Sequence, residues 1–158
     1  MAQLWVNLPA HAKSTPATYQ SLTSDAMPKQ PLGNGHSTFR VIAGEYEGTV
    51  GPAKTHSDLL VMDLELHANE KHVLHFNPNW NVWLTLLTGT ALVNGQEIVR
   101  DASIVSFQQD GEAVHIEANN TARFLVAAGA PINEPVVGYG PFVMNSWNEI
   151  KEAIAQFS

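Results

Sequence analysis

The clearest pattern in the chain is a series of short segments in which apolar and polar residues alternate. Between Leu59 and His67, four apolar side chains (Leu60, Met62, Leu64 and Leu66) share one face. Successive residues of a strand point to opposite sides, so this segment predicts a strand with one buried face. Similar runs recur roughly every eight to twelve residues, a spacing typical of an all-β sandwich or barrel.

Nine strands are predicted in the central region: Phe39–Ala43, Leu59–His67, His72–Phe76, Val82–Thr88, Thr90–Val93, Gln96–Val99, Ser103–Phe107, Ala113–Glu117 and Ala122–Ala128. A further strand is predicted at Leu4–Leu8, followed by a long connection over residues 9–38 that is rich in Pro and Gly. The pair Asn94-Gly95 predicts a tight hairpin turn, because both residues tolerate positive φ.

The segment Val82–Thr88 differs from the others because it is apolar on both faces. Such a strand is expected to be covered twice, by the barrel interior and by something outside. The N-terminal strand, the terminal helix or another subunit could supply the outer cover.

The apolar period changes near the C-terminus. Trp147, Ile150, Ile154 and Phe157 form one stripe of a helix, and Ser146 with Glu149 forms a capping box that starts it. About three turns are too few for an isolated helix, so the stripe must dock on a surface. The whole chain, 1–158, is read as one domain with an N-terminal strand and loop at 1–38, a barrel at 39–140 and a helix at 146–157.

The composition limits the classes of partner and of site that are expected. The formal net charge is −7, from 8 Lys and Arg against 15 Asp and Glu, and no basic run occurs. Nucleic acid and an anionic membrane surface are therefore not expected as partners. The absence of cysteine excludes disulfides and Cys-based zinc sites. No apolar run is long enough to span a bilayer and no signal peptide is recognised, so a cytoplasmic location is expected.

A metal site in a barrel of this kind would need two alternate histidines on one strand, then a carboxylate and a distant third histidine. The sequence has no His-x-His. His75 and His115 stand near the two expected positions and are the only candidate ligands, but Val114 and Ile116 predict that His115 points outward. No metal or other cofactor is therefore expected; the alternative is iron or another divalent ion held by an altered ligand set.

Two further groups of residues were candidates for a site. His67 and His72 flank a turn that contains Glu70, and could be cross-strand neighbours at a surface position. Large aromatic side chains could line a pocket within the barrel, or simply fill its core: Phe76, Trp80, Trp83 and Phe107.

The most specific signal is the run Gly140-Pro141-Phe142-Val143-Met144-Asn145, preceded by Glu134-Pro135 and followed by Glu149-Ile150 and Ala153-Ile154. This stretch resembles the closing signature of pirins. The opening Leu4–Pro9 with Tyr19-Gln20 is similar to the entry into the second pirin domain, and Val41–Glu45 with Gly48 and Gly51-Pro52 resembles the next block of that domain.

The resemblance implies a cupin, or jelly-roll, β-barrel with a short C-terminal helix, equivalent to the second half of a bicupin. Pirins hold a metal, usually iron, in the first barrel, and some act as quercetin 2,3-dioxygenases while others are regulators or interaction modules. Met1 stands directly before the second-domain signature, so those ligands are expected to have no counterpart here. No catalytic residue is carried over.

These observations favour a metal-free, non-catalytic pirin-like cupin that serves as an interaction, regulatory or assembly module. The alternatives are a metal-dependent dioxygenase and a small-molecule-binding barrel. A homodimer through the barrel face or the terminal helix is expected, because a lone second barrel would expose apolar surface.

Overall fold

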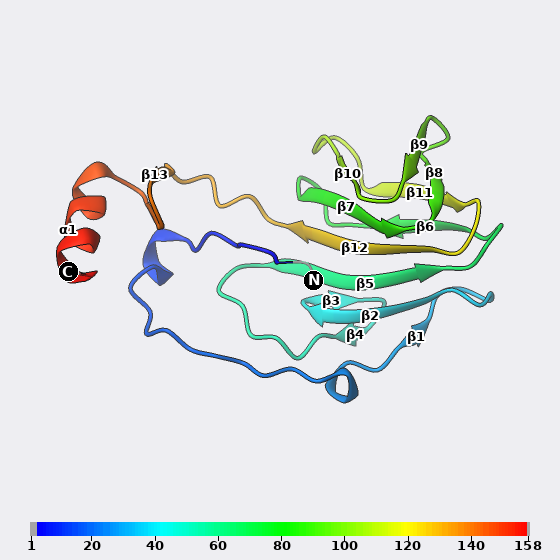
Figure 1. Cartoon of the computed structure of the whole chain (residues 1–158), viewed down its shortest axis with the longest axis horizontal. Coiled ribbons are helices and arrows are strands. Elements are labelled where there is room, and N and C mark those ends of the chain that lie inside the picture. The colour runs from blue at the N-terminus through cyan, green and yellow to red at the C-terminus, as the bar shows by residue number, and fades with distance from the viewer. Residues whose placement is uncertain (1–2, 158) are drawn as a thin grey trace. The chain divides into compact units, whose positions relative to one another are not determined.

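The computed structural model describes residues 3–157 (Figure 1). The chain divides into two compact units. The larger is Gln20–Pro131, and the smaller combines the N-terminal residues up to Tyr19 with those from Ile132 onward. No helix among the described residues has the length and apolar character needed to cross a membrane.

The larger unit is a β-barrel made of two antiparallel sheets. The six-stranded sheet has the order β1-β2-β5-β12-β7-β10, and the four-stranded sheet has the order β6-β11-β8-β9. The strands are β1 (Gln30–Pro31), β2 (Thr38–Ala43), β5 (Leu59–Leu66), β6 (Lys71–His75), β7 (Asn81–Thr88), β8 (Thr90–Val93), β9 (Glu97–Arg100), β10 (Ser103–Ser106), β11 (Ala113–Ala118) and β12 (Ala122–Gly129), with the small hairpin β3 (Glu45–Tyr46) and β4 (Thr49–Val50).

All nine strands predicted in the central region are present, with ends that differ by at most two residues. The hairpin at Asn94-Gly95 is also confirmed, because both residues have positive φ and the turn joins β8 to β9. The short strands β1, β3 and β4 were not predicted, since two residues are too few to show an alternating pattern.

The predicted strand at Leu4–Leu8 is wrong. Those residues are irregular, and the nearest regular element is a 3₁₀ helix at Ala10–Ala12. Leu4, Trp5 and Val6 are consecutive and all exposed, so neither of the two faces of a strand is buried. An apolar run without a pairing partner does not form a strand by itself.

The two sheets enclose one apolar core. Every second side chain along β5 and β12, and from Val82 to Leu86 on β7, is buried and contributes to it. The largest of these side chains, Phe124, Met62, Leu64, Leu84 and Leu86, have no exposed surface. The prediction that Leu60, Met62, Leu64 and Leu66 share the buried face is confirmed.

The smaller unit is built around the helix α1 (Trp147–Phe157), which packs on the hairpin β13 (Val137–Tyr139) and β14 (Phe142–Met144). Ile150 is its buried residue, and ring contacts join Phe142 to Phe157 and Tyr139 to Trp147. Within this unit the helix packs on the hairpin through Ile150, but Trp147, Ile154 and Phe157 of the predicted stripe stay exposed, so the predicted docking of the stripe is confirmed only in part.

Candidate functional site

The two candidate metal ligands, His75 and His115, do not lie in the interior of the barrel, where a metal site would be expected. His75 pairs with Ala113 across β6 and β11, and His115 pairs with Val73. Both histidines are exposed, whereas Leu74, Val114 and Ile116 between them are buried. The outward direction predicted for His115 is confirmed.

The register makes His75 and His115 diagonal neighbours on the outer face of the four-stranded sheet. No cluster of three or more His, Asp or Glu side chains suited to a metal ion occurs within residues 3–157. A cleft of about 420 Å³ lies beside His75, between Asn77 and the β3–β4 hairpin. Burial raises the pKa of Tyr46 in that hairpin to about 12.

The four candidate pocket aromatics separate into two groups. Phe76, Trp80 and Phe107 are partly buried and pack against the apolar core. Trp83 lies on the opposite face of β7, where 51% of its surface is exposed. The barrel thus uses three of these side chains to extend its core and presents the fourth to the surface.

The turn between β5 and β6 holds a compact polar cluster. Glu70 accepts hydrogen bonds from the backbone N–H of His36 (2.7 Å) and of Ser37 (3.1 Å), and from the Ser37 hydroxyl. His72 Nε2 lies 3.1 Å from the same carboxylate. A Cβ on Gly35 would lie 2.5 Å from Glu70, so only glycine permits this approach. The cluster ties the loop before β2 to the turn after β5.

This hydrogen bonding has an electrostatic consequence. The bond from the His36 backbone, with those from Ser37 and His72, lowers the pKa of Glu70 to about 2. Ser37 is fully buried, and its hydroxyl oxygen also accepts the N–H of His67 at 2.9 Å. His67, through its backbone N–H, and His72, through its ring, therefore contact the same pair of residues, Ser37 and Glu70.

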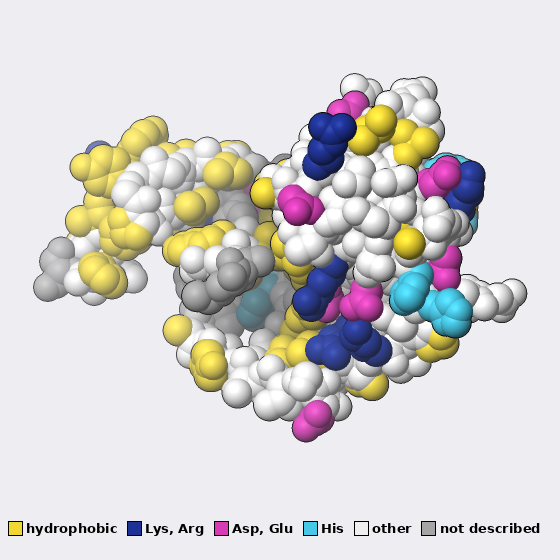
Figure 2. Space-filling model, turned by 45° about the vertical axis from the view of Figure 1, so that its right-hand side comes forward, with side chains coloured by type: hydrophobic (Ala, Val, Ile, Leu, Met, Phe, Trp, Pro, Cys, Tyr) yellow, Lys and Arg dark blue, Asp and Glu magenta, His cyan; other side chains and the backbone are white. Residues whose placement is uncertain are grey.

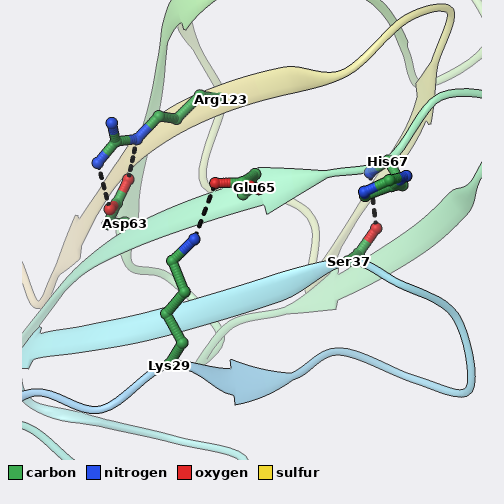
Figure 3. Close-up of polar contacts among 6 residues, drawn as sticks. All are labelled: Lys29, Ser37, Asp63, Glu65, His67 and Arg123. Atoms are coloured by element: carbon green, nitrogen blue, oxygen red, sulfur yellow. Dashed lines mark hydrogen bonds and ion pairs between the residues drawn. The ribbon is translucent and has the colours of Figure 1, made fainter.

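The outer face of the six-stranded sheet carries a row of ion pairs (Figure 3). Arg123 Nε lies 2.9 Å from Asp63 Oδ1, and its Nη2 lies 2.7 Å from Oδ2, which is a bidentate pair between β12 and β5. Lys29 Nζ lies 3.0 Å from Glu65 Oε2. The hydrogen bonds to Asp63 raise the pKa of Arg123.

Beyond these ion pairs, the same outer face becomes apolar. Trp83 and Leu87 on β7 and Ile104 on β10 are exposed, Ile104 by 70%. We call these three residues the apolar patch. The barrel-interior half of the prediction for Val82–Thr88 is confirmed, because Val82, Leu84 and Leu86 are buried; the outer cover stays a prediction.

Charged and apolar side chains are also unevenly distributed over the surface. Lys, Arg, Asp and Glu lie close together over the barrel, while hydrophobic side chains gather over the lobe that carries α1 (Figure 2). In that lobe, residues of the signature run make structural contacts. Glu134 Oε2 accepts the N–H of Ala10 at 2.7 Å and the side-chain amide of Asn145 at 3.0 Å. Glu149 accepts the N–H of Asn145 and caps α1 together with Ser146.

The sequence did not predict the hydrogen bonds between Ser37 and Glu70. It also did not predict that the three residues of the apolar patch lie together. Ser37 and Glu70 are 33 positions apart, and no local pattern indicates that they meet. The apolar character of β7 did signal one edge of the patch. Ile104 carried no signal, because a strand that is buried and one that is exposed at an edge can have the same composition.

Comparison with known proteins gives the family. The model of the Pirin C-terminal cupin domain matches residues 61–158. A Pseudomonas aeruginosa protein named "Putative quercetin 2,3-dioxygenase" is 43% identical over 99% of this chain, and human pirin is 32% identical over 98%. A crystal structure titled as quercetin 2,3-dioxygenase from Acinetobacter baumannii covers 97% of the chain at 39% identity, with a TM-score of 0.91.

The matches concern one part of each relative. The chain spans 54% of the length of the Pseudomonas and human proteins and 53% of the Acinetobacter chain. The predicted resemblance and the predicted cupin fold are confirmed by the family model and by this structural match. The chain therefore belongs to the pirin family, and its match is to the C-terminal cupin domain.

Proposed function

We propose that this cupin domain is a non-catalytic interaction module, and that it associates with a second copy of the chain at the side of its six-stranded sheet that carries the apolar patch. The observation that carries the proposal is the contrast between the two sides of that sheet. The inner side is filled by fully buried apolar side chains such as Phe124 and Leu84. The outer side exposes the apolar patch.

The exposed patch supports association on energetic grounds. Trp83 and Ile104 are 51% and 70% exposed, and each fully buried side chain of this size contributes roughly 1.5–3 kcal/mol. Trp is among the residues that most often dominate binding energy at protein interfaces. The two ion pairs lie to one side of the patch, toward β5 and β1, where they would form part of a polar rim.

The charge distribution favours a second copy as the partner. The chain carries a net charge of −7, so two copies repel each other over most of their surface. The outer face of the sheet is an exception: it holds Arg40, Arg123 and Lys29 against Asp63 and Glu65. Self-association at this face therefore meets less repulsion than elsewhere.

The proposal is tested by the mass in solution of the chain and of two variants. We expect light scattering at micromolar concentration to give twice 17.2 kDa for the wild type. Trp83→Glu places a charge in the apolar patch and should give the mass of one chain. Val50→Glu changes a residue on β4 that is more accessible than Trp83, at 70% against 51% exposure, and should leave the dimer intact. A wild type with the mass of a single chain would overturn the proposal.

A second candidate function is metal-dependent oxygenation, which the names of the relatives suggest and the diagonal placement of His75 and His115 favours. Elemental analysis of protein purified without an affinity tag separates the two candidates. Stoichiometric iron that disappears in His75→Ala or His115→Ala would support the oxygenase. Under the interaction proposal, neither substitution changes the metal content or the dimer.

A further inference from the structure

We propose that the two copies join edge to edge through β10, so that their six-stranded sheets continue as one antiparallel sheet. This inference rests on the proposed dimer and specifies how its two copies meet. It depends on the position of β10, its composition, and the register that a two-fold axis would impose.

The strand β10 is the last of the six-stranded sheet, and among residues 3–157 its one pairing partner is β7. The N–H of Phe107 bonds to the carbonyl of Val82 at 3.1 Å, in the same register that pairs Val105 with Leu84. Backbone groups of alternate residues point to opposite sides of an antiparallel strand. Val105 therefore bonds toward β7, while the N–H and C=O groups of Ile104 and Ser106 point to the free edge.

The other edges of the two sheets carry features that oppose strand addition, and β10 does not. The short β1 contains Pro31, β6 begins with Lys71, and β9 has Glu97 and Arg100 at its ends. Proline and charge at an edge are common defences against edge-to-edge pairing. The sequence of β10 is Ser-Ile-Val-Ser, which has neither.

A two-fold axis through Val105 makes this edge self-complementary. In that register Ile104 lies opposite Ser106 of the second copy, and Ser106 lies opposite Ile104 of the second copy. Each pair exchanges two backbone hydrogen bonds, so all four free donors and all four free acceptors of the two edges are used. An isologous contact of this kind closes at two copies.

The side chains fit the same register. Ser106 lies beside Trp83 on the outer face, and it is small. Ile104 of the second copy would lie over Ser106 and close to Trp83, so that the two apolar patches become continuous. On the other face, Val105 packs partly against the core, where it would meet Val105 of the second copy.

A groove runs along this edge and gives the added strand room. It has a volume of about 510 Å³ and lies between β10 and β9, with Val99, Val105 and Phe107 among its lining residues. The strands β9 and β10 belong to different sheets, so the barrel is not closed by hydrogen bonds at this seam. The same groove could receive another extended segment, and the cross-linking experiment below distinguishes that outcome.

The first test removes a backbone donor without removing the fold. Ile104→Pro deletes an N–H that points away from β7, and proline is tolerated at such edge positions. We expect the dimer dissociation constant to rise at least about tenfold relative to Ile104→Ala, which loses most of the side chain but keeps the donor. Equal dimerisation of the two variants, with unchanged circular dichroism, would show that the edge is not used.

The second test uses the absence of cysteine in the chain. Val105→Cys places two thiols directly opposite each other at the two-fold axis, in a position where the Cα atoms are about 4.5 Å apart. Mild oxidation should give a covalent dimer in high yield. The control, Ile98→Cys on β9, should stay monomeric under denaturing conditions although it is 61% exposed.

The outcomes separate this inference from the proposed function. A wild type that is monomeric in solution removes both. A dimer that Trp83→Glu dissociates, but that neither cross-links through Val105→Cys nor responds to Ile104→Pro, retains the interaction face and refutes the edge-to-edge arrangement. Capture of an unrelated extended peptide by a chain that does not self-associate would likewise refute it.

Discussion

The two faces of the six-stranded sheet use the same strands for different purposes. On β12, the alternation assigns Phe124 and Val126 to the core, and Arg123 and Leu125 to the opposite face. The inner side chains are completely buried, whereas Arg123 is exposed and paired with Asp63. A single strand therefore supplies both a part of the apolar core and a part of the charged outer surface.

The difference shows where specificity can change without loss of the fold. Core positions are constrained by close packing on every side, so their substitution is felt throughout the barrel. Outer positions are constrained by one or two neighbours. The proposed interface lies on the less constrained face, and substitutions on the two faces should differ strongly in their effect on stability.

The largest effect is expected from the inner face. Phe124→Ala removes a fully buried ring and should lower the free energy of unfolding by about 3–5 kcal/mol. Leu125→Ala, one residue along the same strand and only partly buried, should cost clearly less. Urea denaturation followed by circular dichroism measures both. Similar losses for the two variants would contradict the assignment of the faces.

A smaller effect is expected where the loop before β2 meets the end of β5. Ser37→Ala removes a fully buried hydroxyl that donates to Glu70 and accepts from the N–H of His67. Leaving those groups without their partner should cost about 1–3 kcal/mol in the same denaturation experiment. Ser21→Ala changes an exposed serine and should be nearly neutral. A neutral Ser37→Ala would mean that water replaces the hydroxyl.

The contrast between the faces was predictable from the sequence, but the loops were not. The alternation from Leu59 to His67 predicted its buried positions correctly because a strand has only two faces. The failed strand at Leu4–Leu8 shows the limit of that reasoning: composition favours extended backbone, but pairing requires a neighbour that the local sequence does not specify. The hydrogen bonds between Ser37 and Glu70 likewise join residues that are far apart in the sequence, so the local pattern does not predict them.

Acid should expose the contribution of Glu70. Its pKa is about 2 in the folded chain and about 4.5 in an ordinary carboxyl, so the folded state favours the ionised form. The stabilisation is complete above the ordinary pKa and is lost as the pH falls through about 2. The difference in melting temperature between wild type and Glu70→Gln should therefore shrink from pH 5 to pH 2. A difference that is independent of pH would show that the carboxylate charge is not involved.

The smallest effect is expected for the ion pair between Asp63 and Arg123. Its bidentate geometry, at 2.7 and 2.9 Å, favours the interaction, but the Arg123 side chain is 51% exposed and solvent weakens it. A double-mutant cycle with Asp63→Asn and Arg123→Gln should give a coupling free energy of about 0.2–1 kcal/mol, which decreases as salt is added. The pair between Lys29 and Glu65 provides the comparison: it joins two partly exposed side chains through one contact of 3.0 Å and should show weaker coupling. A coupling free energy larger than the loss of unfolding free energy in Phe124→Ala would mean that the outer face contributes to folding as the inner face does. A coupling free energy that does not change with salt would mean the same. Coupling within the expected range would leave this face free to change its charges, and therefore its partner, at little cost to the barrel.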